Sequence, residues 1–260
     1  MPENDLQLLA RAARAAGDLA TGYWQRSPRS WEKAEGAGPV TEADIAVNEL
    51  LKAELLAARP DYGWLSEESE DDPARLTCRR VFVVDPIDGT RAFIAGERNW
   101  AHSLAVAEGG HVTAAVIYLP MLDKLYAATP GGGAYLNEVR IRCAARTGLA
   151  GAQVLCTRAN LDPGHWPGGV PVLERHFRPS LAYRLALVAE GRFDAMITFR
   201  DTWEWDVAAG ALIATEAGAR VTDCHFEPPR FNNPTPTLPG MLAASGKVHE
   251  ELCRHIRPDP

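Results

Sequence analysis

The chain has 260 residues, of which 46% are hydrophobic, so it can bury a large core as one domain or as two closely packed ones. Its formal net charge of −7 argues against binding to nucleic acid or to an anionic membrane. The charge does not exclude a phosphate-bearing substrate, because a bound divalent cation can reverse the local field.

Three features of the sequence lead us to expect a cytoplasmic protein. No apolar run approaches the roughly 20 residues that span a bilayer. The acidic segment 1–5 does not resemble the start of a signal peptide. The five cysteines are scattered and include no C-x-x-C pair, which is typical of reduced, buried side chains.

The first half of the chain, residues 1–140, is expected to form an α+β unit. Apolar residues at helical spacing predict a helix over 5–24 and a second one from Thr41-Glu-Ala-Asp44, which resembles a capping box. The apolar run 81–84 predicts a buried strand. Alternation on either side of two glycines predicts a hairpin of two further strands over 103–119.

The second half, residues 141–260, alternates strand and helix and is expected to form a smaller α/β unit. Apolar runs predict strands over 154–156 and 195–198. Helical spacing that ends at a glycine predicts helices over 180–190 and 206–217. The five prolines of the segment 228–240 predict a loop, and a short helix is expected near the C-terminus.

The most informative motif follows the strand at 81–84 and reads Asp85-Pro-Ile-Asp88-Gly-Thr90. Its proline and glycine predict a tight turn, which can aim both carboxylates and the Thr90 hydroxyl at one point. Two carboxylates that converge in dry surroundings repel each other unless a cation lies between them. Hard oxygen ligands suit Mg²⁺. The motif therefore predicts a magnesium site, whereas an isolated D-x-x-D would more often be an acidic turn.

Further acidic residues accompany this motif in a regular order. Glu67 and Glu68 precede the predicted strand, and Asp206 follows Trp205 ahead of a predicted helix. Taken singly, the glutamates could belong to a solvated loop and Asp206 could be a helix cap. With Asp44 added, the chain reads D…EE…DPIDGT…WD.

This pattern resembles the metal-dependent, lithium-sensitive phosphatase superfamily that includes inositol monophosphatase, 3′(2′),5′-bisphosphate nucleotidase and fructose-1,6-bisphosphatase. The order and spacing of the motifs fit from the first helix to the last, and the segment 126–137 resembles the family's Y…G-x-G-A-x-x-N segment. The resemblance implies an α/β layered sandwich in the order αβαβα, with the active site between the two halves. It also implies a homodimer, for which no residue of this chain gives an independent argument.

Carried over residue by residue, the resemblance implies two Mg²⁺ ions and a weaker third. Their ligands would be four carboxylates and one backbone carbonyl: Glu67, Asp85, Asp88, Asp206 and Ile87. Two cations about 4 Å apart neutralise a phosphate ester, lower the pKa of a bound water and stabilise the leaving alkoxide. Asp44 and Glu68 are expected to support these ligands rather than to bind metal themselves.

The catalytic residues that the resemblance implies are Glu67, Asp88 and Thr90. Glu67 and Thr90 would orient the attacking water. The backbone amides of Gly89 and Thr90 would open a helix, and such N-termini bind phosphate with their unpaired N–H groups. Asp206 would also contact the substrate.

Substrate specificity is expected to lie in the second half of the chain. The segment 157–160 resembles the Ser-Arg-Ser-His segment of bisphosphate nucleotidases, and 198–201 lacks the glutamate that inositol monophosphatases usually carry there. Three arginines are candidates for binding a second phosphate, although surface ion pairs would also explain them: Arg158, Arg184 and Arg200. Trp203 and Trp205 could stack on an adenine or pack in the core.

The sequence thus predicts a Mg²⁺-dependent phosphomonoesterase for a small phosphorylated metabolite, with a bisphosphate nucleotide favoured over inositol 1-phosphate. Histidinol phosphate and fructose 1,6-bisphosphate are further alternatives, and a non-catalytic metal-binding regulator is a distant one. The seven histidines show no H-E-x-x-H or H-x-H spacing, which disfavours a zinc hydrolase. No G-x-S-x-G motif supports a serine nucleophile.

Overall fold

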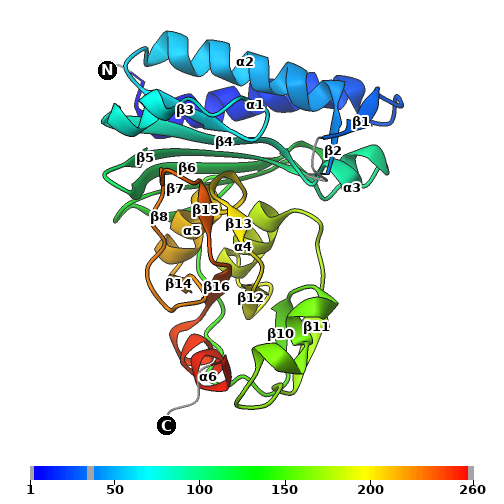
Figure 1. Ribbon diagram of the computed structural model, residues 1–260, viewed down its shortest axis with the longest axis vertical. Helices are drawn as coiled ribbons and strands as arrows, with labels where there is room; N and C mark the ends of the chain where they lie inside the picture. The colour runs from blue at the N-terminus through cyan, green and yellow to red at the C-terminus, as the bar shows by residue number, and fades with distance from the viewer. Residues whose placement is uncertain (1–2, 34–37, 257–260) are drawn as a thin grey trace.

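The computed structural model describes residues 3–33 and 38–256 and arranges them in alternating layers of helix and sheet (Figure 1). The layers follow one another as α1 and α2, a seven-stranded sheet, α4 and α5, a five-stranded sheet, and α6. The helices are α1 (Asp5–Tyr23), α2 (Glu42–Ala58), α3 (Thr90–Ile94), α4 (Leu181–Ala189), α5 (Glu204–Glu216) and α6 (Gly246–Ile256). The αβαβα order that the resemblance implied is confirmed. None of the described helices is long and apolar enough to cross a membrane.

The seven-stranded sheet has its strands in sequence order. They are β3 (Gly63–Ser66), β4 (Arg80–Asp88), β5 (Ala101–Glu108), β6 (His111–Leu119), β7 (Lys124–Thr129), β8 (Gly133–Leu136) and β9 (Val139–Ile141). β3 runs parallel to β4, and β5 and β6 form the predicted antiparallel hairpin. Leu104 and Val106 pack toward α1 and α2, whereas Ala105 and Ala107 pack toward α4 and α5. The sheet is therefore covered on both faces.

The five-stranded sheet has the order β11-β10-β12-β16-β14. Its strands are β10 (Ala152–Leu155), β11 (Leu173–His176), β12 (Ala195–Thr198), β14 (Arg220–Thr222) and β16 (Met241–Ala244). β10 is parallel to both of its neighbours, and β16 is antiparallel to both of its own. Because the two sheets are formed by successive stretches of chain, we keep the division near residue 140 as a proposal.

Three local expectations need correction. β4 does not end before Asp85, as the tight turn predicted, but continues through Asp88, with an irregular register between Asp85 and Asp88. α5 begins at Glu204, two residues earlier than predicted. The proline-rich loop contains a short strand, β15 (Thr237–Leu238), which pairs with β13 (Thr202–Trp203) just before α5. The remaining strands, β1 (Ser30–Glu32) and β2 (Pro39–Thr41), form a hairpin ahead of α2.

Candidate active site

Three aspartates meet between the seven-stranded sheet and the helices beneath it. Asp85 and Asp88 come from the irregular end of β4, and Asp206 comes from the first turn of α5. One carboxylate oxygen from each residue lies within 4.8 Å of the others. Asp85 is 1% exposed and Asp88 is 7% exposed. The fold therefore gathers into one buried cluster three residues that the sequence predicted as metal ligands.

The surroundings of this cluster fit a divalent cation. Burial, with a further contribution from neighbouring carboxylates, raises the pKa of Asp85 and Asp206 well above its usual range. Burial likewise raises the pKa of Asp88 to about 6. Asp85 Oδ1 is buried without a hydrogen-bond donor among the described residues. A buried carboxylate oxygen without a donor is costly, and a hard cation such as Mg²⁺ would supply its missing partner.

Helix α4 fixes the orientation of Asp88 from the opposite layer. Asp88 Oδ2 accepts hydrogen bonds of 2.6 Å from the Ser180 hydroxyl and 2.6 Å from the Ala182 backbone N–H. Ser180 also caps α4 by accepting from the Tyr183 N–H. The sequence placed Ser180 at the start of a helix but gave no sign that the cap also holds a metal ligand.

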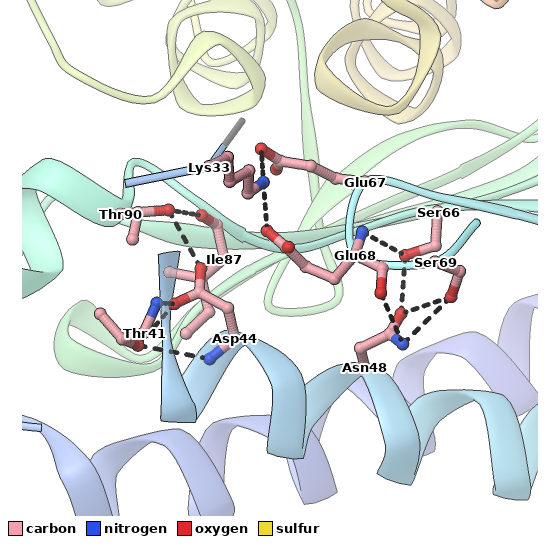
Figure 2. Close-up of polar contacts among 10 residues, drawn as sticks. All are labelled: Lys33, Thr41, Asp44, Asn48, Ser66, Glu67, Glu68, Ser69, Ile87 and Thr90. Carbon is pink, nitrogen blue, oxygen red and sulfur yellow. Dashed lines mark hydrogen bonds and ion pairs between the residues drawn. The ribbon is translucent and has the colours of Figure 1, made fainter. Parts of the chain in front are cut away.

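A second network holds Thr90 at the end of the same motif (Figure 2). The Thr90 hydroxyl lies 3.0 Å from Asp44 Oδ1 and 3.1 Å from the Ile87 carbonyl oxygen. Asp44 in turn accepts hydrogen bonds from the Thr41 backbone N–H and hydroxyl in the capping box of α2. Burial raises the pKa of Asp44 to about 6. The capping box of α2 thus fixes the position of the Thr90 hydroxyl. Thr90 is the first residue of α3 and follows Gly89, whose φ of 103° lies in the left-handed region.

The glutamate pair is held by a lysine that the sequence analysis missed. Lys33 Nζ lies 2.7 Å from Glu67 Oε1 and 2.6 Å from Glu68 Oε1, as Figure 2 shows. Burial and the charge of Glu67 raise the pKa of Glu68 to about 7. Ser66 directly precedes the two glutamates, and its hydroxyl donates a hydrogen bond to Asn48 of α2. Lys33 is 34 positions away from Glu67, so no local motif could indicate this contact.

The acidic cluster lies at a cavity of about 540 Å³. Its wall includes every predicted metal ligand and both residues predicted to bind phosphate through their amides: Glu67, Asp85, Ile87, Asp88, Asp206, Gly89 and Thr90. Asp44 and Glu68 are not part of the wall. The wall also includes two aromatic residues and three arginines: Phe177, Trp203, Arg91, Arg178 and Arg200. From the sequence, Trp203 and Arg200 are candidate substrate contacts, and Arg91, directly after Thr90, could lie near the phosphate or on the surface.

Two predicted substrate arginines do not line this cavity. Arg158 is exposed on a short 3₁₀ helix. Arg184 is buried within α4, where its Nε donates to the Arg178 carbonyl at 2.5 Å. Its Nε and one terminal nitrogen therefore donate to the backbone carbonyls of Arg178 and Pro179. Trp205 packs in the core, 9% exposed.

Comparisons with known proteins agree with this arrangement. The sequence model of the "Inositol monophosphatase family" matches residues 1–259. An inositol-1-monophosphatase of Rhizobium meliloti is 39% identical over 71% of each chain, and a histidinol-phosphatase of Chlorobaculum parvum is 34% identical over 82% of this chain and 83% of its own. The solved Thermotoga maritima IMPase superposes with a TM-score of 0.83 over 96% of each chain, at 27% identity. The chain therefore belongs to the inositol monophosphatase family and is a phosphatase of that family.

Proposed function

We propose that the chain hydrolyses the phosphate monoester of a small metabolite with water, in a reaction that requires Mg²⁺. The observation that carries this proposal is the buried cluster of Asp85, Asp88 and Asp206, which lines a cavity of substrate size and, among the described residues, leaves Asp85 Oδ1 without a hydrogen-bond donor. Mg²⁺ held there would neutralise the ester's charge, lower the pKa of a bound water and stabilise the leaving alkoxide. The expected ligands are those predicted from the sequence, including Glu67 and the Ile87 carbonyl.

The residues around the cluster have distinct tasks in this proposal. A Thr90 hydroxyl that donates to Asp44 keeps its lone pairs free to accept a hydrogen bond from the attacking water. Glu67 lines the same cavity and would accept a second hydrogen bond from that water, which fixes its direction. Gly89 and Thr90 would bind the phosphate oxygens through their backbone amides. Ser180 keeps Asp88 turned toward the cluster.

We infer that inositol 1-phosphate is the first substrate to test. A relative at 39% identity is named inositol-1-monophosphatase. The favoured prediction from the sequence, a bisphosphate nucleotide, loses support because Arg158 and Arg184 do not line the cavity. It stays a second candidate, because Arg178 and Arg200 do line it and guanidinium groups bind phosphate bidentately. Histidinol phosphate is the substrate named for another relative and belongs in the same panel.

Phosphate release tests both levels of this proposal. Inositol 1-phosphate, adenosine 3′,5′-bisphosphate and histidinol phosphate would be supplied in parallel to protein stripped of metal and to the same protein with Mg²⁺ restored. We expect release from at least one ester only when Mg²⁺ is present. The highest kcat/KM identifies the substrate class. Full activity in the presence of a chelator, or no activity on any ester, would overturn the proposed reaction.

A further inference from the structure

Asp85 and Asp88 share one face of the seven-stranded sheet, although they are three residues apart in β4. Side chains of a regular strand alternate between the two faces, so residues three apart would point in opposite directions. Here Asp85 lies opposite Ser103 and Asp88 lies opposite Ala101, and these two residues of β5 are only two apart. Two residues of β4 therefore occupy the space of one, which is a β-bulge. Because residues directly opposite each other share a face, the bulge brings both aspartates to the same side.

The neighbours of the bulge show the same change of direction. Val84 and Ile87 are also three apart, yet both pack in the apolar cluster on the side of α1 and α2. On the other side of the sheet, the Ser103 hydroxyl donates a hydrogen bond of 2.9 Å to the Trp205 carbonyl. Asp206 follows Trp205 in α5. The bulge thus turns Asp85 and its partner in the motif toward the helix that supplies the third aspartate.

The single residue of β5 that lies opposite the bulge is His102. Its side chain is fully buried, and its ring lies 5.5 Å from the Trp100 ring and 6.5 Å from the Tyr118 ring, between centroids. Both of these rings pack on the side of α1 and α2, so His102 lies on the face opposite to the acidic cluster. It does not line the cavity. Its Nδ1 instead contacts the backbone carbonyl oxygen of Pro86, inside the bulge.

This contact is a hydrogen bond that the ring donates. Burial lowers the pKa of His102 to about 4, so the imidazole is neutral at pH 7 and carries one N–H. A carbonyl oxygen can only accept, so the proton is on Nδ1. Nε2 has no hydrogen-bond partner among the described residues, which leaves the Pro86 carbonyl as the ring's polar contact there. Burial of an imidazole at this position is therefore explained by its bond to the bulge.

The bulge needs a donor from outside the regular sheet ladder. Proline has no backbone N–H, and a bulge interrupts the pairing of the strand locally. The His102 side chain supplies a donor to one of the two carbonyls of the bulge, that of Pro86. The other carbonyl belongs to Ile87 and is an expected Mg²⁺ ligand. Fixing the first carbonyl also fixes the direction of the second, because the two peptide groups are adjacent.

We propose that His102 is a positioning residue for the metal site. Its hydrogen bond to the Pro86 carbonyl holds the bulge of β4, and the bulge keeps Asp85 and Asp88 on the face where Asp206 lies. This inference rests on the proposed function, since it assigns how the ligands of that site are oriented. It adds to the site a residue that contacts neither the ion nor the substrate.

Two substitutions separate the hydrogen bond from the packing of the ring. His102→Leu keeps an apolar side chain among the neighbouring rings but removes the donor. His102→Asn loses the ring but keeps an N–H near the position of Nδ1. His102→Gln, whose amide reaches the position of Nε2 instead, replaces the leucine variant if that variant does not fold. Val116→Ala, at a buried residue of β6 in the same apolar layer, is the control for a loss of stability without a change at the bulge.

The dissociation constant of Mg²⁺ would be measured by calorimetry on the metal-stripped wild-type chain and on each variant, together with urea unfolding. We expect His102→Leu to bind Mg²⁺ about tenfold more weakly or worse, as is typical when a supporting contact is lost. His102→Asn should stay closer to the wild-type affinity, even if it unfolds more easily than the leucine variant. Val116→Ala should lose stability and keep the wild-type affinity. Equal affinities of the leucine and asparagine variants, or weaker binding by the asparagine variant, would overturn the positioning role.

Amide hydrogen exchange in the metal-free protein separates this inference from the proposed function. Loss of the hydrogen bond should speed exchange in 87–88 and 101–103 by about tenfold or more in His102→Leu, beyond what its change in global stability explains. The increase should be smaller in His102→Asn and absent in Val116→Ala. Unchanged exchange in these segments of the leucine variant would overturn the role of His102 even if the wild type binds Mg²⁺. A wild-type chain without affinity for Mg²⁺ would instead overturn the proposed function, and the exchange rates would still decide whether His102 holds the bulge.

Discussion

The protonation of three buried carboxylates links pH to metal binding at the scale of single residues. The pKa values of Asp85, Asp88 and Asp206 are raised in the folded protein, so these groups hold protons more tightly there than in the unfolded chain. Their contribution to stability is complete below the unfolded pKa of about 4 and is lost as the pH rises through the folded values, about 6 for Asp88. A cation can bind only after these protons leave.

Stabilisation by Mg²⁺ should therefore grow with pH. At pH 7.5 the ion meets ionised carboxylates and relieves their repulsion, whereas at pH 5 it must first displace protons. With Mg²⁺ at about 100 times its Kd, we expect a stabilisation near 2.7 kcal/mol at pH 7.5, or a Tm increase of about 5–10 °C. The increase at pH 5 should be clearly smaller. Thermal unfolding with and without Mg²⁺ measures both, and an equal shift at the two pH values would contradict the assignment.

The Ser180 hydroxyl supports the metal site through Asp88. Ser180→Ala removes one of the two hydrogen bonds to Asp88 Oδ2, and loss of such supporting contacts typically lowers metal affinity or activity about 10–100-fold. The α4 cap is lost as well, which costs about 1 kcal/mol. Ser180→Thr keeps the hydroxyl and is the matched control. Mg²⁺ titrations that give the same affinity for both variants would show that Ser180 serves α4 alone.

At the scale of helices and strands, the start of α5 determines where Asp206 lies. The helix begins with Glu204, whose carboxylate accepts hydrogen bonds from the backbone of Asn232 and from both the backbone and the side-chain amide of Asn233. The sequence predicted a start at Asp206, because an aspartate before an apolar helical run resembles an N-cap. The true start depends on the 232–233 loop, which is remote in sequence and therefore invisible to local patterns.

Glu204→Gln should destabilise the protein and disturb Asp206. Both carboxylate oxygens of Glu204 accept hydrogen bonds, but the side-chain amide of glutamine has only one acceptor oxygen. Its NH₂ group would therefore face an N–H donor and leave that hydrogen bond unmade. We expect a loss of about 1–3 kcal/mol in urea unfolding, together with weaker Mg²⁺ binding. Glu227→Gln, at an exposed position, should change neither quantity. Unchanged stability in the Glu204 variant would mean that the loop contacts do not fix the helix.

At the scale of the whole molecule, the site lies between layers that are formed by different stretches of the chain. The motif 85–90 could be recognised from sequence because its residues are adjacent, and the helices and central strands follow from their apolar periodicity. Strand length alone does not decide this: the four-residue β12 was predicted from its apolar run, whereas the equally short β11, β14 and β16 were not, because so few residues leave the pattern ambiguous. The layer order came from the family resemblance rather than from the pattern. Lys33 and the rings at 177 and 203 reach the site only through tertiary contacts.

Binding of Mg²⁺ should reduce local opening in both layers that contribute residues to the acidic cluster. The cluster connects β4 with α5, and Asp88 connects β4 with α4. Amide hydrogen exchange should therefore slow on adding Mg²⁺ not only in 85–90 but also in 180–184 and 204–208. Segment 139–141 at the far edge of the sheet is the internal reference. Protection confined to 85–90 would mean that the ion binds β4 without joining the layers.

The most direct test of the account compares phosphate release by the wild-type chain and by Asp206→Asn across a Mg²⁺ titration. The cluster requires Asp206 from α5 as well as the two aspartates of β4, so we expect the substitution to lower kcat/KM by at least about 100-fold. Circular dichroism should show an unchanged fold, and the wild-type protein should regain activity when Mg²⁺ follows a chelator. Substantial Mg²⁺-dependent activity in Asp206→Asn would contradict a catalytic metal site built from these three aspartates.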